Sequence, residues 1–275
     1  MSSEINRFCI EIVDLQRLYR LISPLVLTAI QVTIVVSDDG LRFVCENGTL
    51  LQVIIYYNVK NLQKLEKNQG SQFVMIKVAI NDFLDILRGC KFTDTVAKIY
   101  YNEGVNENII NVDVVEEMTK TTFKIEASPT IATTAFRGKE GDIPQNCTLL
   151  SKNLLEGISY IAEHNSEVKL VISSEELYLY SDKEGTKDEY YVLFTSDYVL
   201  DLISHYADFY WYSSDLLKKL LPFLKLTEYC KIKISREGVL ELKIEFNDSD
   251  YCINCVQVWI SGINNSDFTT ENSFT

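Results

Sequence analysis

Apolar and polar residues alternate along most of the chain, which predicts a protein built mainly from β-strands. Helical spacing replaces this alternation in two stretches of each half. The first such stretch has an apolar stripe at Leu15, Leu18, Ile22 and Leu25, and an opposite face with Arg17, Arg20 and Pro24. Asp14 is placed to cap this helix, and Pro24 is expected to shorten or kink it.

The pattern of the first half recurs in the second half. The matching apolar pairs are Leu18 and Leu154, Ile22 and Ile158, and Val36 and Ile172 at an offset of 136, and Leu84 and Leu217 at an offset of 133. Because nearly one offset serves helices and strands alike, the sequence predicts a duplicated module.

The alternation and the helical stripes predict one order of elements in both halves. Strands are expected at 8–13, 29–36, 41–46, 50–57, 72–78, 96–101, 109–115 and 121–126, and then up to 150 and at 168–173, 177–181, 190–195, 231–235, 240–246 and 251–260. Helices are expected at 14–25, 81–88, 153–162 and 214–221, the last stopped by Pro222. Residues 58–70 are predicted to be a loop, and residues 197–212 fit either a helix or a strand.

Residues 129–146 have neither a strand's alternation nor a helix's stripe. They hold Pro129 and Pro144, with Gly138 and Gly141 between them, which is typical of an exposed connector. The chain of 275 residues is therefore predicted to be an α+β protein of two similar domains. Their expected bounds are 1–128 and 147–262, with the connector at 129–146 and a disordered tail at 263–275.

The net charge of −13 argues against extensive contact with nucleic acid, since phosphate binding depends on lysine and arginine. The charge is unevenly distributed. Residues 1–128 hold 13 basic and 16 acidic residues, a net of −3, whereas residues 147–275 hold 11 and 21, a net of −10. Any surface that faces DNA must exclude most of these acids.

Seven cysteines, an odd number, lie mostly in apolar strand-like runs, and the N-terminus does not resemble a signal peptide. We expect a reducing compartment. No apolar run approaches the roughly 18 residues of a membrane span, so no membrane association is expected.

Residues that could support catalysis or metal binding are few. His164 and His205 are far apart in the chain, and Cys252 and Cys255 form only half of a zinc pattern. Asp182 and Glu184 have the spacing that two-metal nucleases use, and Asp248 and Asp250 form a second acidic pair, but both lie in predicted turns. The sequence therefore predicts no catalytic residue, metal or cofactor. A 3′-to-5′ exonuclease is the enzymatic alternative.

Basic residues gather instead on the exposed sides and ends of the predicted helices. They are Arg17, Arg20, Arg88, Lys91, Lys152, Lys218 and Lys219. One such cation is usually only a solvated charge, but together they can follow phosphates without reading base sequence.

Two stretches resemble the DNA sliding clamp family: Gly40–Asn47, which reads GLRFVCEN, and Ser214–Glu237. Within that family the chain is most similar to the Rad-one type of subunit of the heterotrimeric checkpoint clamp, the nine-one-one complex. The resemblance implies two clamp domains per chain, with helices lining a channel inside curved antiparallel sheets.

The resemblance also implies a function. A non-enzymatic subunit would assemble with two other clamp-like subunits, be placed on double-stranded DNA by a clamp loader in the nucleus, and recruit repair and checkpoint proteins. A homotrimeric replication clamp is the alternative within the family.

The resemblance assigns roles to particular residues. Arg17, Arg20, Arg88 and Lys218 fall where clamps place cations that face the channel, whereas Asp85 and Glu156 reduce its positive charge. The strands 121–126 and 190–195 match the edges that pair between subunits, through Thr121, Phe123, Ile125, Tyr191 and Leu193. Glu46 stands where the partner-peptide pocket has a large apolar residue, which argues against peptide docking near Leu51, Ile131 and Phe136.

Overall fold

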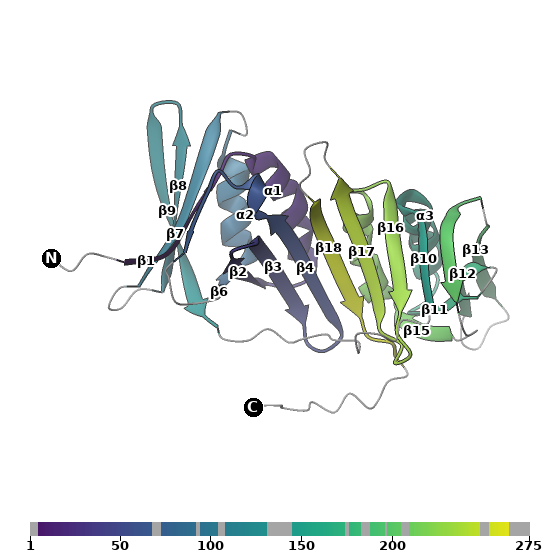
Figure 1. Ribbon diagram of the computed structural model, residues 1–275. Coiled ribbons are helices and arrows are strands. Elements are labelled where there is room, and N and C mark those ends of the chain that lie inside the picture. Colours follow the sequence, from purple (N-terminus) through teal and green to yellow (C-terminus); the bar gives the residue numbers. More distant parts are fainter. Residues whose placement is uncertain are drawn as a thin grey trace. The chain divides into compact units, whose positions relative to one another are not determined.

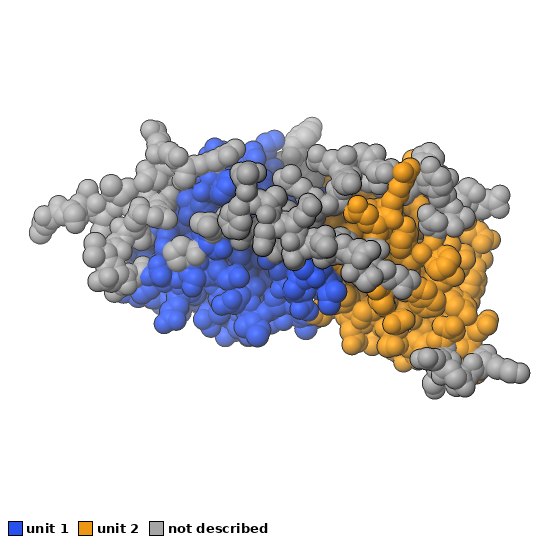
Figure 2. Space-filling model, turned by 90° about the horizontal axis from the view of Figure 1, so that it is seen from below, with its two compact units in different colours: residues 1–135, 245–257 blue, residues 136–244, 258–275 orange. Residues whose placement is uncertain are grey.

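The computed structural model describes residues 5–67, 73–91, 94–103, 108–130, 145–173, 176–182, 188–195, 197–204, 209–247 and 253–263. The chain forms two compact units, coloured separately in Figure 2. The first unit comprises residues 1–135 and 245–257, and the second comprises residues 136–244 and 258–275. The predicted connector and tail lie outside the described residues for most of their length.

The first unit is an antiparallel sheet with two helices (Figure 1). Its elements are β1 (Ile5–Ile12), α1 (Leu15–Ile22), η1 (Ser23–Leu27), β2 (Gln31–Ser37), β3 (Gly40–Asn47), β4 (Leu51–Asn58), η2 (Val59–Asn61), β5 (Lys64–Lys67), β6 (Phe73–Ala79), α2 (Ile80–Gly89), β7 (Thr95–Glu103), β8 (Ile109–Glu116) and β9 (Thr119–Pro129). The strands are ordered β4-β3-β2-β6-β9-β8-β7-β1-β5.

The second unit has its strands in the same order around α3 and the helical pair α4 and α5. They are β10 (Gln145–Leu150), α3 (Ser151–Ala162), β11 (Glu167–Ile172), β12 (Leu177–Asp182), β13 (Glu189–Phe194), β14 (Val199–Ser204), β15 (Phe209–Ser213), α4 (Ser214–Lys218), α5 (Leu221–Leu224), β16 (Tyr229–Ile234), β17 (Leu240–Asn247) and β18 (Ile253–Ile260). Strands β14-β10-β16-β17 lie in one sheet, and β13-β12-β11-β15 form a separate four-stranded sheet. The division between the units passes through β17 and β18.

The strand registers show that the two units are copies of one module. Val36 pairs with Leu41 in the first unit, and Ile172 pairs with Leu177, 136 positions further on, in the second. The pairings agree as well, since β1 contacts β5 and β7 while β10 contacts β14 and β16. The duplication that the sequence predicts is therefore present in the hydrogen-bonded framework.

The helices form where the apolar stripes predict them. Leu15, Leu18 and Ile22 are fully buried, and the side chain of Asp14 accepts a hydrogen bond from the backbone N–H of Arg17 at 2.9 Å. This cap satisfies one of the free N–H groups of the first turn. The helix ends before Pro24, as expected, but Pro24 is buried in the 3₁₀ helix η1 and does not point outward with the arginines.

The structure corrects two other predictions and decides one that the sequence left open. Residues 58–70 are not simply a loop, because they contain η2 and the strand β5, which pairs with β1. Strand β5 has no apolar alternation since it is an edge strand with half-buried and exposed residues. Residues 197–212 contain two strands, β14 and β15. Pro222 does not stop the fourth helix, which ends at Lys218; it stands in the first turn of α5, where its missing N–H costs nothing.

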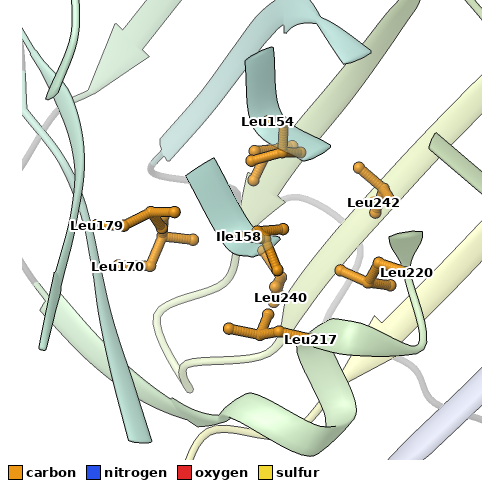
Figure 3. Close-up of a pocket in the computed structure, with 9 residues that line it drawn as sticks. Leu154, Ile158, Leu170, Leu179, Leu217, Leu220, Leu240 and Leu242 are labelled. Atoms are coloured by element: carbon orange, nitrogen blue, oxygen red, sulfur yellow. The ribbon is translucent and has the colours of Figure 1, made fainter. Parts of the chain in front are cut away.

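The core of the second unit contains a small cavity between α3, α4 and the strands, lined only by leucine and isoleucine (Figure 3). Its volume is about 10 Å³. At the equivalent place of the first unit, Phe43 and Phe83 pack with ring centroids 6.2 Å apart, whereas the second unit has Leu179 at the position of Phe43. The cavity is the packing consequence of the smaller side chain, and it is too small to hold a ligand.

Candidate nucleic-acid interface

The two arginines of α1 differ in their surroundings. Arg20 is exposed in the last turn of the helix. Arg17 is half-buried, and its Nη1 donates a hydrogen bond to Oδ1 of Asn61 at 3.2 Å. Asn61 belongs to η2, in the stretch predicted to be a loop, so the sequence pattern did not reveal this contact. Arg20 is therefore the better placed of the two to meet a phosphate.

Helix α2 presents Arg88 beside α1. Its Nη1 lies 2.8 Å from Oδ1 of Asp85, and its Nε donates to the hydroxyl of Tyr19 at 3.4 Å. Lys91, just beyond the helix, is exposed, and its backbone N–H donates to Oε1 of Glu116 at 2.8 Å. Arg88 thus approaches α1, but a carboxylate one turn away offsets its charge.

The helices of the second unit repeat this pairing. Lys152 lies 3.8 Å from Glu156, and Lys218 lies 3.6 Å from Asp215, each across one helical turn. Lys219 is half-buried at the end of α4. Exposed ion pairs of this kind contribute about 0–1 kcal/mol, so a phosphate can displace the carboxylate at little cost. These helix surfaces are close to neutral, not strongly basic.

The strands matched to subunit edges, β9 and β13, each carry a backbone edge that no described strand covers, and β5, β14 and β15 also end their sheets. Among the described residues, Thr119–Glu126 of β9 pairs only with β8, and β9 meets β6 only from Ala127 onward. Strand β13 pairs only with β12 and ends its sheet. Thr121, Phe123, Tyr191 and Leu193 are exposed, whereas Ile125 is buried and packs inward. Ile125 therefore contributes to the core and not to the outer surface.

The buried carboxylate of Asp113, on the neighbouring strand β8, binds two side chains of β9. Asp113 of β8 accepts a hydrogen bond from the hydroxyl of Thr122 at 2.7 Å and forms an ion pair with Lys120 at 2.8 Å. Burial by itself raises the pKa of Asp113, but these two partners outweigh it and hold the pKa below its ordinary value. The sequence offered only a lone acid in an apolar strand as a signal for this network.

The remaining candidate residues are dispersed. Leu51 is fully buried, Glu46 accepts a 2.7 Å hydrogen bond from Gln52, and Ile131 and Phe136 lie outside the described residues. His164 stacks on Tyr190 with ring centroids 4.0 Å apart. Asp182 ends β12 and Cys255 is buried, while His205, Glu184, Asp248, Asp250 and Cys252 lie outside the described residues.

Within the part of the chain that the structure describes, no three histidine, cysteine or acidic residues are grouped as a metal site would require. In the same ranges no helix has the length and apolar character needed to cross a membrane.

Several solved structures share this fold at low sequence identity. PCNA from Thermococcus kodakaraensis matches with a TM-score of 0.73 at 14% identity, over 93% of this chain and 99% of that one. PCNA from Entamoeba histolytica gives 0.74 at 12% identity, over 94% and 99%. A PCNA2–PCNA3 complex from Sulfolobus tokodaii gives 0.69 at 13% identity, over 93% and 99%. The fold is that of the PCNA-type sliding clamps, as the sequence predicts.

The family follows from the sequence itself. Residues 7–245 match the family described as "Repair protein Rad1/Rec1/Rad17", so this chain belongs to that family. No curated protein sequence matches significantly. The family and the fold together make the chain a DNA clamp.

Proposed function

We propose that this chain is a non-enzymatic subunit of a heterotrimeric checkpoint clamp, which encircles double-stranded DNA and recruits repair and checkpoint proteins. Membership of the Rad1/Rec1/Rad17 family is the observation that carries the proposal. The PCNA2–PCNA3 complex among the structures with the same fold supports assembly from non-identical clamp chains.

The open edges of β9 and β13 support assembly into a ring. An exposed edge such as that of β13 presents unpaired N–H and C=O groups, which a neighbouring subunit can extend as a continuous sheet. Tyr191 and Leu193 add exposed apolar area at this edge, with 50% and 40% of their surfaces accessible. The edges of β9 and β13, one in each unit, suit a closed ring, in which each subunit has one neighbour on either side.

The nearly neutral helix surfaces suit a clamp that holds DNA by topology more than by affinity. Few cations can contact phosphate at once, so the affinity of the separate chain for DNA should be low and sensitive to salt. A closed ring remains on a circular molecule whatever its contact energy. Retention on DNA is therefore a better measure of function than binding to a short duplex.

The assembly test is to purify the chain with two candidate clamp-like chains and measure the mass by light scattering. We expect one copy of each chain, and we expect the loaded ring to stay on nicked circular DNA and to leave it after linearisation. A stable homotrimer would instead favour a replication clamp. Equal retention on linear and circular DNA would exclude encirclement.

Enzymatic activity and location are tested separately. We expect the purified chain to leave 3′-ended DNA intact with Mg²⁺ or Mn²⁺ present. Nuclease activity that disappears in Asp182→Ala would overturn the non-enzymatic assignment. Fluorescence microscopy of the tagged chain should place it in the nucleus.

A further inference from the structure

The four-stranded sheet of the second unit has an unusual face directed away from α3. The opposite face packs on that helix, where a Cβ on Gly157 would come within 2.8 Å of Phe194 and 3.2 Å of Val192. On the face away from the helix, the strand registers align side chains in rows across β13, β12, β11 and β15. Each row has its own chemical character.

Two of the rows are apolar or aromatic, and we refer to them together as the aromatic face. One row contains Tyr191, Tyr180, Lys169 and Trp211, and the other contains Leu193, Tyr178, Val171 and Phe209. Ring centroids lie 5.1 Å apart for Tyr178 and Tyr191 and 6.3 Å apart for Tyr180 and Trp211. The aromatic face is thus a connected surface and not a set of isolated side chains.

The aromatic face is open to solvent along its two edge strands, whereas Val171 between them is buried. Tyr191 and Phe209 each expose 50% of their surface, and Leu193 exposes 40%. Its single cation is Lys169, whose Nζ lies 3.6 Å from the centroid of the Phe209 ring. The ammonium group is therefore held over the face of an aromatic ring. Antiparallel sheets usually present polar residues on the solvated face, and a contiguous exposed apolar surface marks an interaction site.

A third row, directly beside the aromatic row, is acidic. Asp182 pairs with Glu189 across β12 and β13, which places like charges opposite each other. Glu167 of β11 is their neighbour, since its carbonyl oxygen accepts a 3.0 Å hydrogen bond from Ser181, the residue before Asp182. Like charges at opposed positions destabilise a sheet unless a cation relieves them. We call Asp182, Glu189 and Glu167 the acidic row.

The field of the acidic row reaches the aromatic face. Burial, and then the charges of Glu189 and Asp182, raise the pKa of Tyr180 above its ordinary value. The same carboxylates repel phosphate, which excludes a nucleic acid as the natural occupant.

The first unit supplies an internal comparison, because its matching sheet has no acidic pair and no aromatic residue at the place of Tyr180. Glu46 pairs with Gln52 at the positions equivalent to Asp182 and Glu189, so the like-charge pair is absent, and the uncharged Gln52 donates a 2.7 Å hydrogen bond to Glu46. Val44 occupies the place of Tyr180 and is buried. The shared module therefore does not require the acidic pair or the tyrosine at position 180, and these two features distinguish the second copy.

We propose that the aromatic face and the acidic row together bind a segment of a partner protein that carries apolar side chains next to arginine or lysine. The apolar side chains would cover Tyr191, Leu193 and Phe209, and the cations would lie between the carboxylates of the acidic row. Arginine suits this place best, because its guanidinium pairs with carboxylates through two hydrogen bonds and also stacks on tyrosine.

The test is a selection from a random dodecapeptide library displayed on phage, with the full chain in its purified assembly as the target. The most enriched peptide is synthesised with a fluorophore, and its Kd is measured by fluorescence anisotropy. We expect enriched peptides to combine aliphatic or aromatic residues with arginine or lysine. An absence of enrichment, or enrichment of acidic peptides, would overturn the proposal.

Three variants locate the site. The double variant Tyr191→Ser and Phe209→Ser should raise the Kd of the peptide about tenfold or more, as loss of aromatic anchors does at interfaces. The double variant Asp182→Asn and Glu189→Gln should raise the Kd about fivefold and make the Kd less dependent on salt. Tyr198→Ser is the matched control, because Tyr198 is 49% exposed but lies outside the three rows, and it should leave the Kd unchanged. Unchanged binding in the first variant would refute the site.

A second copy of this chain is the competing occupant of the aromatic face. Sedimentation at increasing protein concentration tests it, and self-association that Tyr191→Ser and Phe209→Ser abolish would overturn the proposal. Thermal melting confirms that each variant is folded. Tyr191 also borders the edge expected to pair between subunits, whereas Phe209 lies on the opposite edge strand, β15. Phe209→Ser alone should therefore still weaken binding of the peptide while subunit assembly stays intact.

Discussion

Replacing Gly40 by alanine should destabilise the first unit severely. Gly40 begins β3 with φ at +128°, a conformation that side chains oppose. A Cβ there would lie 2.3 Å from the carbonyl oxygen of Tyr57 and 2.6 Å from the nitrogen of Val59. Both are backbone atoms, so no side-chain rotation can relieve the overlap. The same nitrogen donates a 2.8 Å hydrogen bond to the carbonyl of Asp39, which the alanine would push apart.

The expected magnitude follows from these contacts. Strained backbone costs about 1–3 kcal/mol, overpacking about 1–3 kcal/mol, and the lost hydrogen bond about 1 kcal/mol. The free energy of unfolding should fall by about 4 kcal/mol or more, which is a large part of the stability of one domain. Gly48→Ala is the matched control, because Gly48 also has a positive φ, at +57°, but nothing lies within 4 Å of its added Cβ. It should cost only about 1–2 kcal/mol.

The assay is urea unfolding of both variants and the unchanged chain, followed by far-ultraviolet circular dichroism. The transition of the affected unit should move to lower urea in Gly40→Ala, well below its position in Gly48→Ala. Equal destabilisation of the two variants would show that backbone conformation alone sets the cost, and the reasoning from close approach would be refuted.

Three further predictions concern charge and protonation. The pKa of Asp113 is held below its ordinary 3.8, so its contribution to stability is complete above that value and is lost as the pH falls through the lower folded pKa. On acidification, the melting temperature of Asp113→Asn should therefore fall less than that of the unchanged chain. Burial raises the pKa of Cys45 and of Cys230 to about 12 from 9.0, so both thiols should resist a disulfide reagent at pH 8 until urea unfolds the chain. Stability should then decline above pH 9, where these thiols ionise only in the unfolded chain. Changing Arg20 and Arg88 to glutamate should reduce the slope of log affinity for DNA against log salt by about 2, and an unchanged slope would remove both residues from the DNA surface.

Local patterns in the sequence predicted most of the framework. The stripe through Leu15, Leu18 and Ile22 located α1, because burial on one side of a helix requires apolar residues at that spacing. Asp14 located its start. Strand β5 was missed because an exposed edge strand needs no apolar alternation, and its evidence lies only in its pairing with β1. Pro222 was misread because a proline at the first turn of one helix looks, in sequence, like the end of another.

The candidate surfaces show the same limit. Arg17 and Arg20 share one helical face, yet only the structure places Asn61 against Arg17 and leaves Arg20 exposed. Phe123 and Ile125 have the same strand parity, but Ile125 is buried. Which members of a predicted face remain available depends on neighbours that come from distant parts of the chain.

By itself the sequence determined the duplication, the strand and helix periods, and the uneven charge, because each of these depends only on which residues follow one another along the chain. The tertiary structure alone decided which side chains meet. Asp182, Glu189 and Glu167 come from three strands and form a row only through the hydrogen-bonded register between those strands. Register is a property of paired backbones, and no single stretch of sequence contains it.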